Sequence, residues 1–504
     1  MAKEKKKPSR VAARRLKGFR DLTAGEVLAR DRMIATIRGV YERYGFAPLE
    51  TPTLEYVDAL GKFLPDADGP EGGIFAFRDE DEEWIALRYD LTAPLSRYVA
   101  MNIATLPTPF RRYQSGPVFR VEKPGPGRFR EFLQFDYDIV GTASMLADAE
   151  CCMVAADTLS ALGVAPGDFV VKANNRKVLD GVLERVAASG ELPADASVHV
   201  LRAIDKLDRV GLDGVKLLLG PGRKDESGDF LRGVGLGVKQ IDIVLSYLSI
   251  RSATRAALCE ELSKIVGESR VGREGVDELR LMDEALSGGG FTEDRVAFDP
   301  TIVRGLAYYT GPVFEAALTF PVVDEDGVTR QFGSVLGGGR YDDLVARFTG
   351  QKVPATGASI GVDRLLSALI ALGKVDTNAA TARVLVTRLD KSMTAEYQRM
   401  AAELRAAGIN TELYPGTQGI GKQFKYASDT GKTVAVVVGS DEAKQGIVSI
   451  KDLRLGSEMS KDIGADRRKW LEDQPAQFTA PRSELVGAVR GVLERYAAGP
   501  LKNE

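Results

Sequence analysis

The stretch from Phe119 to Asp138, with the sequence FRVEKPGPGRFREFLQFDYD, constrains the fold more than any other region of the chain. Two strand-like runs flank a turn rich in proline and glycine, and this pattern predicts an antiparallel hairpin. Side chains alternate between the two faces of a strand, so the returning run should present two different surfaces. The first surface combines charges, an amide and an aromatic ring, which indicates a site for a charged ligand, whereas the second is mostly apolar. The first carries Arg130, Phe132, Gln134, Asp136 and Asp138, and the second carries Glu131, Leu133, Phe135, Tyr137 and Ile139.

Four further motifs occur along the chain, in this order: RYDLTAP from Arg88, VRGLAYYTG from Val303, GGGRYD from Gly337 and GASIGVDR from Gly357. Together with the hairpin, they resemble the signature motifs of the class II aminoacyl-tRNA synthetases, in which the hairpin is motif 2 and GASIGVDR is motif 3. The blocks between residues 300 and 345 resemble one family in particular, the histidyl-tRNA synthetases. The resemblance covers roughly residues 17 to 455.

This resemblance implies an ATP-dependent ligase that joins L-histidine to its tRNA through a histidyl-adenylate. It implies an α+β catalytic domain with an antiparallel sheet, a mostly helical insertion domain and a C-terminal α/β anticodon-binding domain. A helix and an extended segment within residues 23–56 match motif 1, which implies a homodimer. The expected ranges are a basic disordered tail (1–17), a first catalytic segment with motifs 1 and 2 (18–170), the insertion (171–293), a second catalytic segment with the histidine motifs and motif 3 (294–374), the anticodon-binding domain (381–475) and a C-terminal helix and tail (476–504).

The amino-acid composition limits the kinds of catalytic and binding site that the chain can have. The chain has 504 residues, enough for roughly three or four domains, and a formal net charge of −3, so an RNA site must be a local patch. Only three cysteines occur, which predicts neither a disulfide framework nor a zinc site and fits a reducing cytoplasm. The single histidine, His199, lies far from every motif, which argues against Ser-His-Asp, Cys-His and His-metal chemistry. No apolar run approaches the ~20 residues of a membrane span.

The first 17 residues are strongly basic, with a single acid, Glu4. We interpret this run as a solvated, disordered tail, and a sequence-independent contact with tRNA phosphates is the alternative. A secretory signal is excluded because no apolar core follows the charges. The cations are Lys3, Lys5, Lys6, Lys7, Arg10, Arg14, Arg15 and Lys17.

Adenylate formation requires a carboxylate to attack a phosphate that is already negatively charged. Positive charge and positioning therefore matter more than a strong base, and the planar fork of arginine suits this task. By motif position, the resemblance assigns Arg304 and Arg120 to catalysis at the α-phosphate. Magnesium is expected to arrive with ATP, and no protein-only metal site or zinc is expected. The resemblance assigns ATP binding to Arg120, Glu122, Arg128, Phe132 and Arg364.

Histidine recognition follows from the same motifs. Imidazole offers a donor and an acceptor on opposite edges, which a carboxylate and a phenol can satisfy together. The resemblance gives that role to Asp138 and to a tyrosine hydroxyl, for which Tyr309 is the first candidate. Tyr308 and Tyr341 are equally consistent with packing aromatics. The expected histidine-binding set is Asp90, Thr92, Gln134, Asp138, Arg304, Tyr308 and Tyr309.

Two rival hypotheses remain open. The segment Gly416–Gln423 approximates a P-loop but has Gln423 where magnesium needs a hydroxyl, so we interpret it as a helix start in the anticodon-binding domain. There Gln423, Lys425 and Tyr426 are candidates for contacts with tRNA. The other rival is a catalytically silent regulatory paralogue from histidine biosynthesis, which usually lacks the anticodon domain and the ATP-binding residues retained here.

Overall fold

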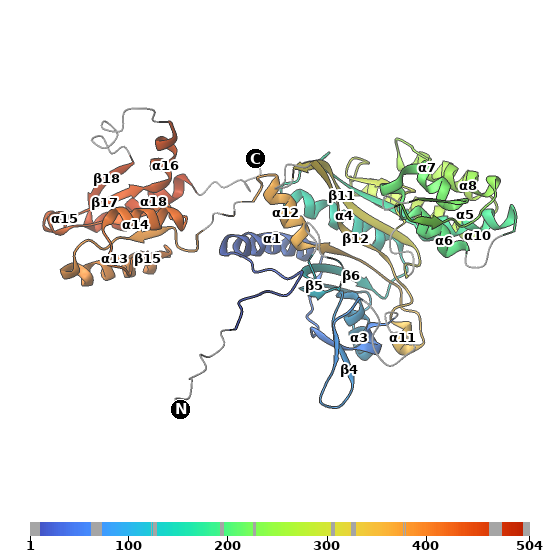
Figure 1. Cartoon of the computed structure of the whole chain (residues 1–504), viewed down its shortest axis with the longest axis horizontal. Helices are drawn as coiled ribbons and strands as arrows, with labels where there is room; N and C mark the ends of the chain where they lie inside the picture. The colour runs from blue at the N-terminus through green and yellow to red at the C-terminus, as the bar shows by residue number, and fades with distance from the viewer. Residues whose placement is uncertain are drawn as a thin grey trace, which may run out of the picture. The chain divides into compact units, whose positions relative to one another are not determined.

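The computed structural model describes residues 11–61, 73–121, 123, 129–191, 196–224, 228–303, 308–323, 329–375, 377, 380–462 and 476–496. The chain divides into two compact units (Figure 1). The first, which we call the catalytic unit, comprises residues 1–21 and 32–372, and the second, the C-terminal unit, comprises residues 22–31 and 373–504. Each unit is described by itself.

The catalytic unit is built on an eight-stranded sheet with the order β1-β5-β6-β13-β12-β11-β7-β10. Neighbouring strands are antiparallel except at the two edges, where β1 pairs with β5 and β7 pairs with β10 in parallel. The expected antiparallel catalytic sheet is therefore confirmed. The strands are β1 (Ala47–Pro48), β5 (Phe110–Phe119), β6 (Glu131–Val140), β7 (Phe169–Asn175), β10 (Val296–Phe298), β11 (Pro312–Val323), β12 (Thr329–Arg340) and β13 (Ala355–Gly361).

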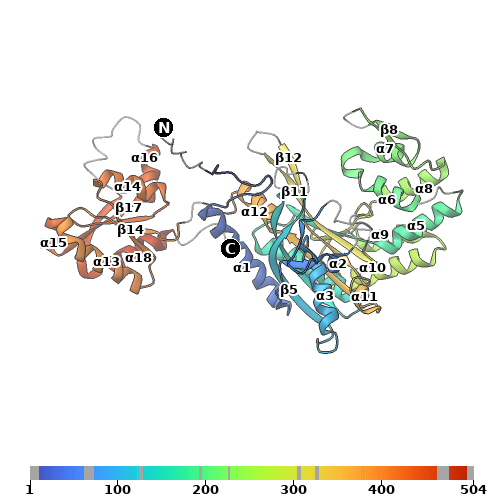
Figure 2. The same ribbon diagram turned by 60° about the horizontal axis from the view of Figure 1, so that its bottom comes forward.

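Helix α1 (Ala24–Arg43), seen beside β5 in Figure 2, and helix α4 (Met145–Ala161) contact one face of this sheet. The ring of Tyr41 lies 4.9 Å from that of Phe135 and 4.8 Å from that of Tyr137, centroid to centroid. The Tyr137 hydroxyl donates to the carbonyl of Cys151 on α4 at 2.7 Å. The apolar side of the β5–β6 hairpin is thus the core side, and its polar side faces the opposite way.

A small three-stranded sheet joins the motif that contains Arg88 to the hairpin. Its order is β2-β4-β3, formed by β2 (Leu54–Tyr56), β3 (Ala76–Arg78) and β4 (Trp84–Leu87). The buried Arg88 guanidinium donates to the carbonyls of Thr51 and Pro117 at 2.8 and 2.9 Å, so this arginine is a structural clamp. Helices α2 (Val57–Leu60), α3 (Thr92–Asn102), α11 (Ala346–Thr349) and α12 (Val362–Ala371) complete the layer around the site.

The insertion is mostly helical, and its short hairpin pairs β8 (Gly222–Lys224) with β9 (Phe230–Arg232). Strand β7 crosses the expected start of the insertion at residue 171, because its buried residues pair with β11 within the catalytic sheet. The Asn174 amide donates to the Tyr247 hydroxyl at 2.8 Å and to the Ile302 carbonyl at 2.9 Å, which joins α8 of the insertion to the catalytic sheet. The helices are α5 (Arg176–Ala188), α6 (Ala196–Ile204), α7 (Leu207–Leu219), α8 (Val238–Leu248), α9 (Arg255–Val266) and α10 (Arg270–Gly288).

The C-terminal unit is an α/β domain with a five-stranded sheet in the order β15-β14-β16-β17-β18. We expected residues 476–504 to lie outside this domain, but β18 (Gln477–Pro481) pairs with β17 and α18 (Leu485–Arg495) buries Leu485 and Val489 in its core. A short edge strand that contains proline has little sequence signal, which explains the difference. The other strands are β14 (Val384–Val386), β15 (Thr411–Leu413), β16 (Val434–Val437) and β17 (Ile447–Asp452). The other helices are α13 (Thr394–Ala406), α14 (Ile420–Asp429), α15 (Ser440–Gln445) and α16 (Leu453–Asp462).

None of the helices in the described regions of the chain combines the length and apolarity that a bilayer span needs.

Candidate active site

A row of paired residues crosses the catalytic sheet on the face opposite α1. Residues paired across neighbouring strands point to the same face, so the row forms one continuous surface. At its centre, Gly337 is exposed, and a Cβ added there would meet no atom within 4 Å. This face of the sheet is therefore uncovered at Gly337, and polar residues flank Gly337 on both sides. The row comprises Gln114, Asp136, Ser359, Gly337, Glu315 and Lys172.

A cavity of about 380 Å³ lies at the Lys172 end of this row. Lys172, Glu315 and Ser334 line it from the sheet, Val303 from the start of the VRGLAYYTG motif, and Asp205 from the insertion. The site thus extends from the motif 2 hairpin toward the insertion along one face of the sheet.

Next to this row, on the same face of the hairpin, Arg112 and Asp138 form a buried ion pair. The two residues are paired across β5 and β6. Arg112 Nη2 lies 2.8 Å from Asp138 Oδ2, and the arginine is fully buried. The Tyr341 hydroxyl donates to Asp138 Oδ1. Burial raises the pKa of Asp138, whereas Arg112 and the Tyr341 hydroxyl lower it. On the next strand, Gly357 leaves room for this carboxylate, because a Cβ there would overlap Asp138 Oδ1.

Two more carboxyl groups adjoin this pair. Burial raises the pKa of Asp136 to about 7; Arg112 lowers it, and Asp138 raises it. Asp90 Oδ1 accepts the backbone N–H groups of Thr92 and Ala93 at 3.1 and 2.9 Å, at the start of α3. Burial raises the pKa of Asp90, and these amides together with Arg120 and Arg112 lower it.

Several polar atoms around this cluster are buried without a hydrogen-bond partner among the described residues. They include Arg112 Nε and Nη1, Gln134 Oε1 and Asp136 Oδ1. The Gln134 amide nitrogen donates to the Ser359 hydroxyl at 2.8 Å, so the amide is fixed with its oxygen unpaired. Because buried polar groups are normally satisfied, this set indicates a polar ligand or water that completes it. Carboxylates and an amide oxygen together suit a ligand rich in N–H donors.

The structure describes three of the five residues expected to bind ATP, namely Arg120, Phe132 and Arg364. Arg120 Nε donates to the Tyr89 carbonyl at 3.1 Å, and its guanidinium lies 5.2 Å from the centroid of the Phe132 ring. Arg364 lies on α12, with Nη2 3.4 Å from where a Cβ on Gly333 would stand. Glu122, Arg128 and Arg304, the other expected contacts, lie outside the described residues.

The tyrosines close the other side of the cluster. The hydroxyl of Tyr308 donates to that of Tyr309 at 2.9 Å, and their ring centroids are 4.2 Å apart. Burial raises the pKa of Tyr309 to about 12; the Tyr308 hydroxyl lowers it, and Asp138 raises it. Tyr341 is more than a packing aromatic, since its hydroxyl holds Asp138.

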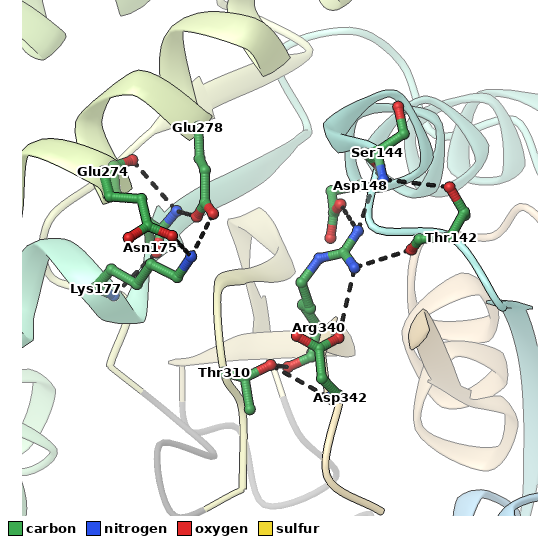
Figure 3. Close-up of polar contacts among 11 residues, drawn as sticks. Thr142, Ser144, Asp148, Asn175, Lys177, Glu274, Glu278, Thr310, Arg340 and Asp342 are labelled. Carbon is green, nitrogen blue, oxygen red and sulfur yellow. Dashed lines mark hydrogen bonds and ion pairs between the residues drawn. The ribbon is translucent and has the colours of Figure 1, made fainter. Parts of the chain in front are cut away.

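Arg340, which precedes Tyr341 in the chain, is held by a network of polar contacts (Figure 3). Its buried guanidinium pairs with Asp148 of α4 and donates to the carbonyls of Thr142 and Ser144 at 3.1 and 3.3 Å. Its own carbonyl accepts the N–H of Thr310 at 2.8 Å. Arg340 therefore couples α4 to Tyr341 and to the end of the Tyr308–Tyr309 turn.

A second polar cluster in Figure 3 is structural. Lys177 pairs with Glu274 and Glu278, and the Asn175 amide donates to Glu278 at 2.7 Å. These contacts join the start of α5 to α10 within the insertion.

The structure brings Asp90, Gln134, Asp138 and Tyr309 together, and their role in histidine binding stays a prediction. It also adds four residues that were outside the expected ATP-binding and histidine-binding sets: Arg112, Asp136, Ser359 and Tyr341. A sequence signal existed for two of them, because Asp136 alternates with Gln134 and Asp138, and Arg112 is one of two adjacent arginines at the start of an otherwise uncharged strand-like run. Only the register across the hairpin shows that Arg112 faces Asp138.

The expected RNA contact of Gln423 is wrong. Its amide is fully buried, accepts the N–H of Arg388 at 2.8 Å, and donates to the carbonyls of Arg388 and Gln418. Gln423 instead closes the loop before α14, which also argues against a P-loop. The Tyr426 hydroxyl donates to Glu412 at 2.5 Å, and Lys425 is exposed.

Comparisons with known proteins agree with this architecture. The family model for histidyl-tRNA synthetase matches residues 18–365, and the model for the anticodon binding domain matches residues 383–489. The histidine–tRNA ligase of Rhizobium rhizogenes is 51% identical over 500 residues, which cover 99% of each chain. That of Bartonella henselae is 52% identical over 489 residues, which cover 97% of this chain and 98% of the relative.

Solved structures give the same answer. The histidyl-tRNA synthetase from Nostoc sp. PCC 7120 superposes with a TM-score of 0.74 at 29% identity and covers 96% of this chain and 100% of its own. An ATP phosphoribosyltransferase regulatory subunit/histidyl-tRNA synthetase from Bacillus halodurans shares the fold, with a TM-score of 0.65 at 22% identity. It covers 83% of this chain and 97% of its own.

The antiparallel sheet with its motif 2 hairpin and motif 3 strand and helix is the catalytic fold of a class II aminoacyl-tRNA synthetase. Within that class, the chain belongs to the histidyl-tRNA synthetase family.

The Arg112–Asp138 pair yields a prediction about substrate recognition. Arg112→Gln should raise the KM for histidine about 10²-fold and leave the KM for ATP within a few-fold, because removing one partner of a buried charge pair costs about 2–5 kcal/mol. Arg112→Lys should recover some of the loss. The measurement is steady-state adenylate formation with each substrate varied in turn.

Arg111→Gln is the matched control, because its side chain lies on the opposite face and pairs with Glu150 of α4. It should leave the KM for histidine near the wild-type value. Equal losses for histidine and ATP in Arg112→Gln would show that Arg112 only supports the fold.

The raised pKa of Asp136 yields a prediction about stability. A carboxyl group whose pKa is higher in the folded state stabilises the fold at low pH, and this contribution is lost as the pH rises through the folded pKa of about 7. Asp136→Asn should therefore increase the melting temperature at pH 8 more than at pH 5. Calorimetry of both proteins from pH 5 to 8 measures the difference, and a pH-independent difference would contradict it.

Proposed function

We propose that this site joins the carboxylate of L-histidine to the α-phosphate of ATP and then transfers the histidyl group to histidine tRNA. The observation that carries the proposal is the buried Asp138 carboxylate, held by Arg112 and Tyr341 beside the uncovered sheet face at Gly337. Membership of the histidyl-tRNA synthetase family indicates the reaction. The carboxylate cluster around Asp138 is the proposed binding site for the amino acid.

In the proposed complex, the imidazole of histidine lies against Asp138 and a tyrosine hydroxyl. Asp138, paired with Arg112, accepts one ring N–H, and the hydroxyl of Tyr309 donates to the other ring nitrogen. Asp90 and Thr92 receive the α-ammonium group, since the second carboxyl oxygen of Asp90 is not used by the amides of α3. The unpaired oxygen of Gln134 is a further acceptor for an N–H donor of the substrate.

ATP is proposed to lie along the hairpin next to this pocket. Phe132 stacks on the adenine and Glu122 approaches its edge, and the close approach of Arg120 to Phe132 supports this placement. Arg120 and Arg304 neutralise the α-phosphate, while Arg128 and Arg364 hold the outer phosphates. Magnesium enters bound to the ATP phosphates and adds positive charge there.

The chemistry needs no protein base in this scheme. The substrate carboxylate is already ionised, so the site acts by alignment and by stabilising the charge that develops on the phosphate oxygens. The carboxylate cluster orients the amino acid from its ammonium and imidazole ends, which leaves its carboxylate directed toward the arginines.

The C-terminal unit is proposed to bind the anticodon of the tRNA, in keeping with the match to the anticodon-binding family. Lys425, which is exposed, remains a candidate for phosphate contact there. We also propose a cytoplasmic homodimer that forms through the motif 1 region.

The regulatory paralogue of histidine biosynthesis is not favoured, because full-length relatives at 51–52% identity are histidine–tRNA ligases and the anticodon-binding match is retained.

Exchange of labelled pyrophosphate into ATP tests this function. The wild-type chain should catalyse exchange that depends on histidine, and Arg304→Ala should lower its rate by about 10²–10³ because one charge donor is lost. Arg280→Ala, an exposed arginine of α10 that pairs with Glu260, serves as the control and should retain full activity. Exchange that is independent of histidine would overturn the proposed function, and Arg304→Ala activity within about twofold of wild type would remove Arg304 from the site.

A further inference from the structure

Residues Gly18–Arg20, the anchor segment, contact the motif 2 hairpin at the start of its returning arm. The carbonyl of Gly18 accepts the N–H of Arg130 at 2.8 Å. The ring of Phe19 meets that of Phe75 edge-on, with centroids 5.9 Å apart. The Arg20 guanidinium lies 4.2 Å from the centroid of the Phe129 ring and donates to Asp363 Oδ1 at 2.6 Å.

These contacts place the anchor segment beside motifs 2 and 3. Phe129 and Arg130 directly follow the hairpin turn, and Asp363 belongs to the first turn of the motif 3 helix. The other oxygen of Asp363 accepts the N–H of Leu133 at 2.6 Å, so one carboxylate links the anchor segment to both motifs. The chain just before Gly18 therefore starts beside Phe129 and Arg130.

That preceding stretch is basic and exposed. Arg14, Arg15 and Lys17 are all exposed, and Arg15 pairs with Asp21 at 3.6 Å, with both side chains largely exposed. Five more cations occur in the sequence before Arg14, against one acid. Since the whole chain has a net charge of −3, this concentration of positive charge is a local feature.

We propose that Arg14, Arg15 and Lys17 form an RNA-binding surface that contacts backbone phosphates near the acceptor end of the tRNA. The inference rests on the proposed function, because the acceptor end must reach the site beside which the anchor segment lies. A polyanion is the partner that exposed cations of one sign attract, and phosphate contacts supply affinity and orientation without sequence information. The surface therefore adds affinity for the tRNA and has no role in adenylate formation.

The test uses the full chain with three simultaneous changes, Arg14→Gln, Arg15→Gln and Lys17→Gln. The matched control carries Arg14→Lys, Arg15→Lys and Lys17→Arg, which keeps the charge at every position. Each protein is assayed for aminoacylation over a range of tRNA concentrations at several salt concentrations. Each is also assayed for histidine-dependent pyrophosphate exchange, which needs no tRNA.

The glutamine variant should raise the KM for tRNA roughly tenfold at low salt and reduce the slope of log KM against log salt by about 2, since each phosphate contact contributes about 0.7–0.9 to that slope. Its pyrophosphate exchange should equal that of the wild type, and the charge-preserving control should behave as the wild type in both assays. An unchanged KM and salt slope in the glutamine variant would overturn the proposal. Loss of exchange in that variant alone, or an equal loss of tRNA affinity in the control, would also overturn it. Absence of exchange in the wild type would instead refute the proposed function.

Discussion

The ion pair between Arg112 and Asp138 is the interaction on which the site depends. A cluster of carboxyl groups buried at the centre of a sheet is unfavourable without a cation, because each ionised group loses its hydration. Arg112 supplies that cation from the neighbouring strand and is itself fully buried. Replacing such a pair by apolar residues is often neutral or stabilising, so its presence here fits a requirement for recognition better than one for stability. The raised pKa of Asp136 supports the same view, since the site retains a carboxyl group that burial disfavours.

The surrounding architecture holds this pair in place. Tyr341 fixes one oxygen of Asp138, and Arg340 fixes the backbone of Tyr341 through its pair with Asp148 of α4. Two glycines on the neighbouring strands leave space on this face of the sheet. Gly357 leaves space for the Asp138 carboxylate, and Gly337 leaves space for a ligand. The result is a preorganised pocket whose acceptors are oriented before any substrate binds.

Much of this could be read from the sequence, because alternation along a strand fixes which residues share a face. The hairpin and its two surfaces followed from that rule. Arg112 could not be assigned in the same way, since its partner is set by the register between strands rather than by spacing along one strand. The burial of Gln423 has no sequence signal, because its amide bonds to residues of a separate loop. The boundary of the insertion at β7 and that of the anticodon-binding domain at β18 could not be predicted from the sequence. Pairing with distant strands, and not local composition, decides where each domain ends.

The most direct test of this account is a crystal structure of the chain with histidine and a non-hydrolysable ATP analogue. The account predicts that the imidazole donates an N–H to the Asp138 carboxylate at roughly 2.6–3.2 Å, while the Arg112–Asp138 pair remains intact. It also predicts that the substrate carboxylate faces the α-phosphate beside Arg120. An imidazole bound away from Asp138, with Asp138 contacting only Arg112 and Tyr341, would contradict it.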